Sequence, residues 1–177
     1  FRPGLVGGHC IGVDPYYLTY KAKKIGFKPN MILSGRQTNE LIPDFISKNL
    51  LKDLKKKNKR YKNTKLLILG LTFKEDCPDM RNSKVKEIYT QLSKKLSQVH
   101  VYDPCVETSD LLKNYPKRSV LKKMPLKKNF YDSILLAVPH KAFIKLGYNK
   151  IIETGSKDVL FYDLKNSFPN KKVDFKL

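Results

Sequence analysis

A cysteine in a glycine-rich turn offers this chain a nucleophile. Cys10 lies in Gly7-Gly8-His9-Cys10-Ile11-Gly12-Val13-Asp14-Pro15, where the glycines let backbone approach a ligand and present bare N–H groups. A cysteine thiolate attacks electrophilic carbon well when its pKa is lowered or when a base lies near. Asp14 follows four residues later, at the expected start of a helix, where its carboxylate can face the same pocket. The spacing also fits a structural role, in which Cys10 is buried in the turn and Asp14 is a helix N-cap. Spacing alone favours this structural role over catalysis.

His9 could act as a metal ligand or a general base. Adjacent side chains in an extended loop point in different directions, so we expect His9 to point away from Cys10. We therefore interpret His9 as a polar loop residue.

A second polar segment, Gly70 to Ser83, joins a predicted strand to a predicted helix. It lacks the GxGxxG pattern, so it is not a dinucleotide fingerprint. It carries Lys74 and Arg81, two cations suited to phosphate. The alternative is a charged surface loop in which Ser83 caps the following helix.

Two helices are expected to position the cysteine turn. Apolar spacing predicts one from Asp14 to about Gly26, which is a plausible C-cap. A second runs from about Gln37 to Lys57, and we interpret its apolar stripe as core packing rather than a cofactor contact. The stripe consists of Leu41, Ile42, Phe45, Ile46, Leu50, Leu51 and Leu54.

A lysine-rich stretch at 55–63 has little to bury, and we place a domain edge near residue 60. Beyond it, short apolar runs alternate with amphipathic stretches, which predicts a parallel sheet with crossover helices. Ligands bind beyond the carboxyl ends of such strands, so the loops at 72–83 and 164–166 should matter. Strands are expected at 66–71, 99–104, 133–139 and 159–163, and helices at 83–97, 106–114 and 140–153.

Composition narrows the class of protein. The chain has 177 residues, 41% hydrophobic and 29% charged, with no apolar run long enough for a bilayer. Its net charge of +20 is spread along the sequence without an aromatic-interleaved basic motif, which favours a solvated lysine-rich surface over a nucleic-acid site. Its 3 cysteines form no CxxC pair, so we expect neither a disulfide framework nor a metal site, and we expect a reducing cytoplasm.

Two long motifs carry a family resemblance. Gly-Gly-His-Cys-Ile-Gly-Val-Asp-Pro at 7–15 and Gly-Leu-Thr-Phe-Lys-Glu-Asp at 70–76, followed by Asp79-x-Arg81-Asn-Ser83, resemble the UDP-glucose/GDP-mannose dehydrogenase family. The residue pattern around the cysteine looks most like that of the branch that acts on UDP-N-acetylhexosamines. The resemblance covers essentially the whole chain.

The resemblance implies an α/β fold in two parts. Residues 1–60 would end a helical central segment that supports a homodimer through the helix at 37–57. Residues 61–177 would form a Rossmann-like UDP-sugar-binding domain. The cysteine motif lies within ten residues of the first residue, Phe1, so we expect sequence upstream, including an NAD-binding domain with a catalytic lysine and asparagine. We expect this chain alone to be inactive.

The resemblance also implies a reaction. Members oxidise the C6 alcohol of a UDP-sugar to a uronate with two NAD+, for surface polysaccharide synthesis. Cys10 matches the nucleophile that forms a thiohemiacetal and then a thioester, and Asp14 matches an aspartate that activates water or moves protons. Substrate contacts would fall on Phe1, Arg2, Pro3, Gly4, Leu5, Val6, Gly7, Phe73, Lys74 and Lys165. Cofactor contacts would fall on Cys10, Ile11, Gly12, Val13 and Arg81.

Lys165 departs from the pattern, because relatives acting on UDP-glucose have an arginine there, and lysine is a point charge rather than a bidentate fork. An alternative function is a non-catalytic remnant or a UDP-sugar-binding assembly module. A basic nucleic-acid-binding protein is a third, less favoured, hypothesis. The sequence does not determine which N-acetylhexosamine is used.

Overall fold

The computed structural model describes residues 4–125 and 127–177. The predicted substrate contacts Phe1, Arg2 and Pro3 lie outside the described residues. Helices and strands alternate after residue 64, as predicted. The elements are α1 (Asp14–Lys24), α2 (Asn30–Lys56), a 3-10 turn (Tyr61–Asn63), β1 (Lys65–Leu69), α3 (Val85–Ser93), β2 (Gln98–Tyr102), α4 (Thr108–Asn114), β3 (Tyr131–Leu136), α5 (Lys141–Leu146), α6 (Tyr148–Ile152) and β4 (Gly155–Asp163).

The four strands form one parallel sheet in the order β2-β1-β3-β4. The chain builds outward from β1 to β2, then crosses back to lay β3 on the other side of β1. The strand order therefore reverses between β1 and β3, and crevices at such reversals are where open α/β sheets bind ligands. The prediction of an α/β fold with a parallel sheet is confirmed.

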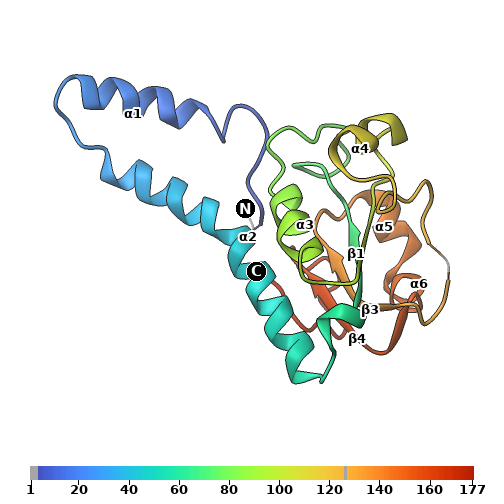
Figure 1. Cartoon of the computed structure of the whole chain (residues 1–177). Helices are drawn as coiled ribbons and strands as arrows, with labels where there is room; N and C mark the ends of the chain where they lie inside the picture. The colour runs from blue at the N-terminus through green and yellow to red at the C-terminus, as the bar shows by residue number, and fades with distance from the viewer. Residues whose placement is uncertain (1–3, 126) are drawn as a thin grey trace.

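Both faces of the sheet are buried. Residues with one parity along the strands, such as Leu66 and Ile68, join the core beneath α2 and α3. Residues with the other parity, such as Leu67 and Leu69, join a second core with Phe143 of α5. Figure 1 shows these helices on opposite sides of the sheet. Burial on both faces explains why β1 and β3 read as continuous apolar runs, whereas the edge strand β2 alternates between buried and partly exposed residues.

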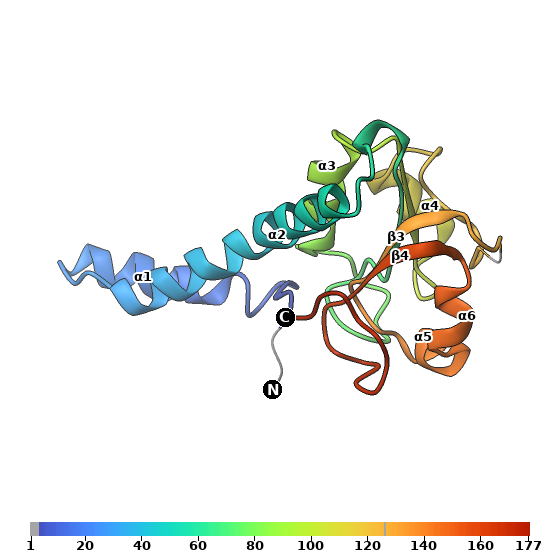
Figure 2. The ribbon, with the colours of Figure 1, turned by 90° about the horizontal axis from the view of Figure 1, so that it is seen from below.

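Helix α2 has two different surroundings. Ile46, Leu50 and Leu54 are fully buried against the sheet and α3, so the core-packing interpretation is confirmed for the second half of the stripe. Leu41 and Phe45 are 57% and 52% exposed. The first half of α2 and the whole of α1 extend away from the sheet as an arm (Figures 1 and 2).

The arm is more helical than the sequence predicted. Helix α2 begins at Asn30, directly after Pro29, rather than near Gln37. The extra turns bury little, so apolar periodicity gave no signal for them. Helix α1 ends at Lys24 and its C-cap is Ile25, one residue before the predicted Gly26. The φ of +79° at Gly26 allows Gly26 N–H to donate to Lys23 and Phe27 N–H to donate to Ala22. No helix among the described residues is long and apolar enough to span a membrane.

Gly70 connects the sheet to the loop that follows β1. Its φ is +82°, and a Cβ at this position would lie 2.2 Å from the carbonyl oxygen of Val138. Only glycine lets β1 and the end of β3 approach this closely, which makes Gly70 a sensitive probe of the crevice between them.

We predict that Gly70→Ala lowers the free energy of unfolding by roughly 2 to 5 kcal/mol, because backbone strain and steric overlap add. Gly35→Ala is the matched control: Gly35 lies in α2 with open space around it, so alanine should stabilise by up to about 1 kcal/mol. Urea denaturation of both variants measures the difference. Equal effects of the two substitutions would contradict the steric account.

Candidate functional site

The cysteine turn is bound to the loop that follows β1. Gly8 N–H donates to the carbonyl of Arg81 at 3.1 Å. In return, Asn82 Nδ2 donates to the carbonyl of Gly8 at 3.0 Å. The two motifs, about seventy residues apart in sequence, are therefore joined by reciprocal hydrogen bonds two residues before Cys10.

Phe73 packs directly on the glycines of the turn. A Cβ on Gly7 would lie 2.9 Å from Phe73 Cβ and 2.7 Å from the carbonyl oxygen of Asn82. A Cβ on Gly8 would lie 2.9 Å from the Phe73 ring, and the φ of Gly8 is +81°. The glycines therefore allow the cysteine turn to pack closely against the loop after β1. Phe73 lies beside the turn as a result.

His9 and Cys10 lie side by side, which corrects the expectation that they point apart. Cys10 Sγ is 3.6 Å from His9 Nδ1. The chain bends after Gly8 instead of running extended, so adjacent side chains reach the same side. Cys10 is exposed, as a thiol that meets a substrate must be.

A line of polar contacts leads from Asp79 to the sulfur. Asp79 accepts hydrogen bonds from Arg81 Nε at 3.0 Å and from Arg81 Nη2 at 2.7 Å. The same Nη2 lies 2.9 Å from His9 Nε2, where it can only donate. A neutral His9 then carries its proton on Nδ1, facing Cys10. This arrangement offers a hydrogen-bond donor to a thiolate or to an oxyanion formed beside it.

Hydrogen bonding from Arg81 lowers the pKa of Asp79 to about 2, against the smaller opposing effect of burial. Asp79 therefore stays a carboxylate at any physiological pH and keeps the exposed Arg81 side chain oriented toward His9.

Asp14 is the first residue of α1, and its N–H donates to the carbonyl of Cys10 at 2.8 Å. The N-cap is Val13, so the alternative assignment of Asp14 as a cap is wrong. An exposed carboxylate in the first helical turn is favoured by the helix dipole. The turn that begins α1 thus brings Cys10 and Asp14 to the same end of this helix.

The loop after β4 joins the other side of the site. Lys165 Nζ donates to Glu75 Oε1 at 2.5 Å, and its aliphatic carbons lie against Gly4. Partial burial by itself would raise the pKa of Glu75, but the hydrogen bond and charge of Lys165 outweigh it, so this pKa lies below its usual value. Lys74 stays exposed, with its ammonium 5.4 Å from the Phe73 ring centre. Both loops predicted to bind ligand therefore meet near the cysteine turn.

A cleft of about 830 Å³ opens on the α1 side of the turn, between α2 and α3. Its lining includes three predicted cofactor contacts: Gly12, Val13 and Arg81. Arg36 and Lys84 add positive charge, and Lys84 is paired with Glu40 and Glu87. Ile11 is 70% exposed, and its carbonyl accepts from Arg36 at 3.4 Å. Val6 also lines the cleft, whereas Gly4 and Leu5 lie toward the sheet.

Two domains of one known protein family match this chain. Residues 67–170 match the UDP binding domain of the UDP-glucose/GDP-mannose dehydrogenase family, and residues 1–41 match its central domain. The chain belongs to this family. The family resemblance seen in the two sequence motifs is confirmed.

Several family members resemble the chain over all or most of its length. It is 40% identical over 177 residues to a UDP-N-acetyl-D-glucosamine 6-dehydrogenase of Salmonella typhi, and 42% identical over 177 residues to one of Pseudomonas aeruginosa. Both alignments cover 100% of this chain and 41% of the relative. Protein CapL of Staphylococcus aureus is 42% identical over 145 residues, which are 82% of this chain and 34% of CapL. The chain thus spans less than half the length of these relatives.

Solved structures of the family share the fold. A UDP-D-ManNAc dehydrogenase from Pyrococcus horikoshii matches 98% of the chain with a TM-score of 0.76 and 25% identity, over 39% of its own length. An NDP-N-acetyl-D-galactosaminuronic acid dehydrogenase from Methanosarcina mazei Go1 matches 99% with a TM-score of 0.78 and 24% identity, over 39% of its length.

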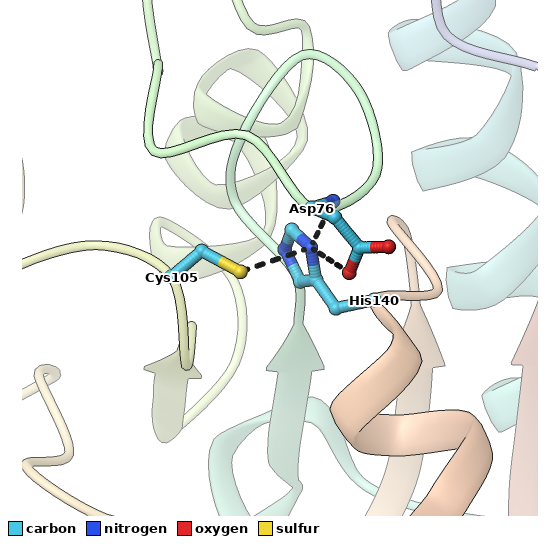
Figure 3. Close-up of side chains that lie close together, drawn as sticks. All are labelled: Asp76, Cys105 and His140. Atoms are coloured by element: carbon cyan, nitrogen blue, oxygen red, sulfur yellow. Dashed lines mark hydrogen bonds and ion pairs between the residues drawn. The ribbon is translucent and has the colours of Figure 1, made fainter.

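A buried network behind the β1 loop of this family member was not predicted (Figure 3). Fully buried His140 follows β3; its Nε2 lies 2.9 Å from Asp103 Oδ2, and its Nδ1 accepts the N–H of Asp76 at 2.9 Å. Cys105 lies beside the ring, and burial together with the Asp103 and Asp76 carboxylates raises the pKa of its thiol. Each of these residues follows a strand, and that position was the available sequence signal.

Other contributors were missed or misassigned. The motif around Arg81 predicted no role for Asn82, although the Asn82 amide donates to the carbonyl of Gly8. Ser83 does not cap α3, because Lys84 is the N-cap. Instead, the buried Ser83 hydroxyl donates to the carbonyl of Thr72 at 3.3 Å and ties the two ends of the β1 loop together.

We predict that Asp79→Asn destabilises the fold at pH 6 and has almost no effect near pH 2. The folded-state pKa of about 2 lies below the ordinary 3.8, so the stabilisation is present above about pH 4 and is lost as pH falls toward 2. The loss at pH 6 should exceed that of the control variant but stay modest, because solvent screens the exposed Arg81. Urea denaturation across this pH range checks it.

The matched control is Asp44→Asn, which removes an exposed i,i+4 pair with Lys48 on α2. It should change the free energy of unfolding by less than about 0.5 kcal/mol throughout the pH range. A pH-independent effect of Asp79→Asn would show that the pair with Arg81 does not stabilise the loop.

Proposed function

We propose that these residues form the carboxy-terminal part of an NAD-dependent UDP-N-acetylhexosamine 6-dehydrogenase in which Cys10 is the nucleophile. One observation carries the proposal: the turn that holds Cys10 is hydrogen-bonded to the loop that holds Phe73, Lys74 and Arg81. The relatives named UDP-N-acetyl-D-glucosamine 6-dehydrogenase support the substrate class. Because the chain spans 41% of those relatives, we propose activity only for an enzyme that also contains an NAD-binding domain.

The substrate side would lie where Gly4, Phe73 and Lys165 converge. Lys74 and Lys165 supply positive charge for the diphosphate, and Phe73 supplies an aromatic wall. Lys165 reaches this side already paired with Glu75, so a diphosphate would compete with that carboxylate for its ammonium. We retain Phe1, Arg2, Pro3, Leu5, Val6 and Gly7 as proposed substrate contacts, together with Gly4.

The cofactor side would lie along the cleft beyond Gly12 and Val13. The cleft suits an anionic cofactor, because the four cations in its lining, Arg36, Arg81, Lys84 and Lys86, outnumber the two carboxylates, Glu40 and Glu87. Arg81, Cys10, Ile11, Gly12 and Val13 are the proposed contacts. When bound, NAD+ would accept the hydride in each of the two oxidations. Arg81 would contact NAD+ through its guanidinium, which Asp79 already orients.

Cys10 would hold the reacting carbon between the two oxidations. Its sulfur adds to the C6 aldehyde to form a thiohemiacetal, and His9 Nδ1 can donate to the developing oxyanion. Loss of a hydride and a proton gives a thioester, and attack by water releases the uronate and returns the thiol. Asp14, at the start of α1, is the proposed group for activating that water.

The domain boundary, the use of the product and the cellular setting are also proposals. We place the boundary between the helical segment and the UDP-sugar domain near residue 60. We propose that the uronate serves surface polysaccharide synthesis in a reducing cytoplasm, where the three cysteines stay free thiols. Nothing in the arrangement of the described loops selects one N-acetylhexosamine.

We predict that Cys10→Ser abolishes uronate formation, by at least about a thousandfold, in an enzyme that joins these residues to an NAD-binding domain. UDP-sugar affinity should change less than threefold, because the phosphate-binding cations remain. NADH production and calorimetric UDP-sugar binding measure the two effects. Cys77→Ser is the control and should keep full activity.

The same experiment separates the proposal from a non-catalytic module that only binds UDP-sugar. Such a module would bind ligand but release no uronate with Cys10 present. Turnover by the serine variant equal to the wild type would remove Cys10 from its proposed role.

We also propose a homodimer formed through the arm. Exposed apolar side chains cover α1 and the start of α2, including Tyr17 at 70%, Ile25 at 72% and Met31 at 89% exposed. A soluble monomer rarely exposes so many large apolar groups in one region. A second copy of the arm would bury them.

We predict that Tyr17→Glu combined with Met31→Glu converts the dimer to a monomer in sedimentation velocity experiments. Buried carboxylates in an apolar interface would cost more than the contacts gain. Leu112→Glu, at a 42% exposed position on α4, is the control and should leave the dimer intact. A monomeric wild-type chain at high concentration would disprove this role for the arm.

A further inference from the structure

Three loops at the carboxyl edge of the sheet bring a mixed set of metal-ligand atoms together. Asp76 comes from the loop after β1, Cys105 from the segment after β2, and His140 from the segment after β3. One ligand atom from each residue lies within 4.8 Å of the other two. Figure 3 shows the thiol and the carboxylate on either side of the imidazole. The site proposed for UDP-sugar oxidation uses none of these three side chains.

The donor types suit zinc. A thiolate, an imidazole nitrogen and a carboxylate oxygen are the three ligand types of protein zinc sites, with Zn–S near 2.3 Å and Zn–N near 2.0–2.1 Å. Tetrahedral ligands at those lengths lie about 3.5 Å apart. Cys105 Sγ lies 3.4 Å from His140 Nδ1, which matches that spacing. Asp76 Oδ1 lies 4.0 Å from the same nitrogen, so its side chain must move by a fraction of an ångström.

The imidazole is already oriented for coordination through Nδ1. Its other nitrogen, Nε2, lies 2.9 Å from Asp103 Oδ2. Asp103 is held in turn by the N–H groups of Leu71 at 2.6 Å and Cys105 at 2.8 Å. A buried carboxylate on the far nitrogen fixes the tautomer and the ring orientation of zinc-binding histidines. His140 and Asp103 are 0% and 3% exposed, so this support is rigid.

Two existing hydrogen bonds compete with a metal, and in one of them Asp76 Oδ1 accepts the N–H of Lys141 at 2.9 Å. The N–H of Asp76 donates to His140 Nδ1 at 2.9 Å and occupies the lone pair that a metal would use. A Zn²⁺ ion about 2.0 Å from Nδ1 would overlap with the Asp76 amide nitrogen, so the exposed loop that holds Asp76 at a φ of +52° must shift this peptide away from the ring. Asp76 and Cys105 face outward enough for an ion to enter, while His140 forms the buried base.

We propose that Asp76, Cys105 and His140 bind one Zn²⁺ ion per chain, with water in the fourth position. On coordination the Cys105 thiol releases its proton to solvent, and the Asp76 amide moves off Nδ1 so that its lone pair binds the metal. The ion would join one side chain from each of the three loops. One of them carries Phe73 and Lys74, so the metal holds the substrate-side loop in place.

The test uses thiol variants of the 177-residue chain, because Cys10 lies beside His9 and could bind metal adventitiously. In the Cys10→Ser, Cys77→Ser chain, Cys105 is the only thiol. Titration with Co²⁺ should then saturate at one equivalent per chain. The bound ion should show tetrahedral ligand-field bands and a cobalt–thiolate charge-transfer band. Stoichiometric Zn²⁺ should abolish the bands and raise the midpoint of thermal unfolding.

The matched control is the Cys77→Ser, Cys105→Ser chain, in which Cys10 is the only thiol. It should show no charge-transfer band and at least tenfold weaker Zn²⁺ binding. Asp76→Asn in the Cys105-only chain keeps the size of the side chain and the backbone N–H, and should also weaken binding at least tenfold. Circular dichroism of each variant confirms that it folds.

The proposal fails if the folded Cys105-only chain shows no cobalt–thiolate band. It also fails if the Cys10-only chain binds Zn²⁺ equally well, or if Asp76→Asn leaves the affinity unchanged. Failure would leave His140 as a hydrogen-bonded anchor of the β1 loop and would not affect the proposed dehydrogenase function, which rests on Cys10.

Discussion

The contact between two bare glycines and a phenylalanine ring governs the arrangement of this molecule's candidate site. Gly7 and Gly8 lie so close to Phe73 and Asn82 that any side chain would overlap with them. Reciprocal hydrogen bonds between Gly8 and the segment Arg81–Asn82 then fix the register of the two loops. Because Cys10 follows two residues later, its position is set by backbone packing rather than by its own side-chain contacts, which leaves the thiol exposed and available.

The sheet supplies the fixed frame for that contact. The strand order reverses between β1 and β3, and Gly70 allows the ends of these strands to approach. Loops leaving β1, β2 and β3 therefore emerge at one edge, where His140 and Asp103 bind them to one another. The β1 loop is held from behind by this buried pair and from the front by the cysteine turn. A loop fixed on both sides can present Phe73 and Lys74 with little conformational freedom.

Helix α2 links the two halves of the molecule. Its second half is buried in the main core, and its first half carries the exposed arm with α1. Asn39 on the exposed half donates to the carbonyl of Val6 at 3.2 Å, and Arg36 reaches Ile11. The helix thus braces the cysteine turn while its base is anchored by apolar burial.

The sequence by itself determined the family, the parallel α/β class, the strands and the ends of α1, because long motifs, buried apolar runs and a C-capping glycine are local signals. It also identified Cys10, Phe73, Lys74, Arg81 and Lys165 as candidates, since their motifs are contiguous. Only the tertiary structure decided which of them meet. The proximity of His9 to Cys10 depends on a bend, the Arg81–His9 contact joins residues 72 positions apart, and the Asp76–Cys105–His140 cluster joins three separate loops. The bend and the contacts between distant segments depend on how the folded chain brings its loops together at one edge of the sheet, which leaves no spacing in the sequence to read. The early helical turns of α2 escaped prediction for a related reason: they bury too little for apolar periodicity to mark them.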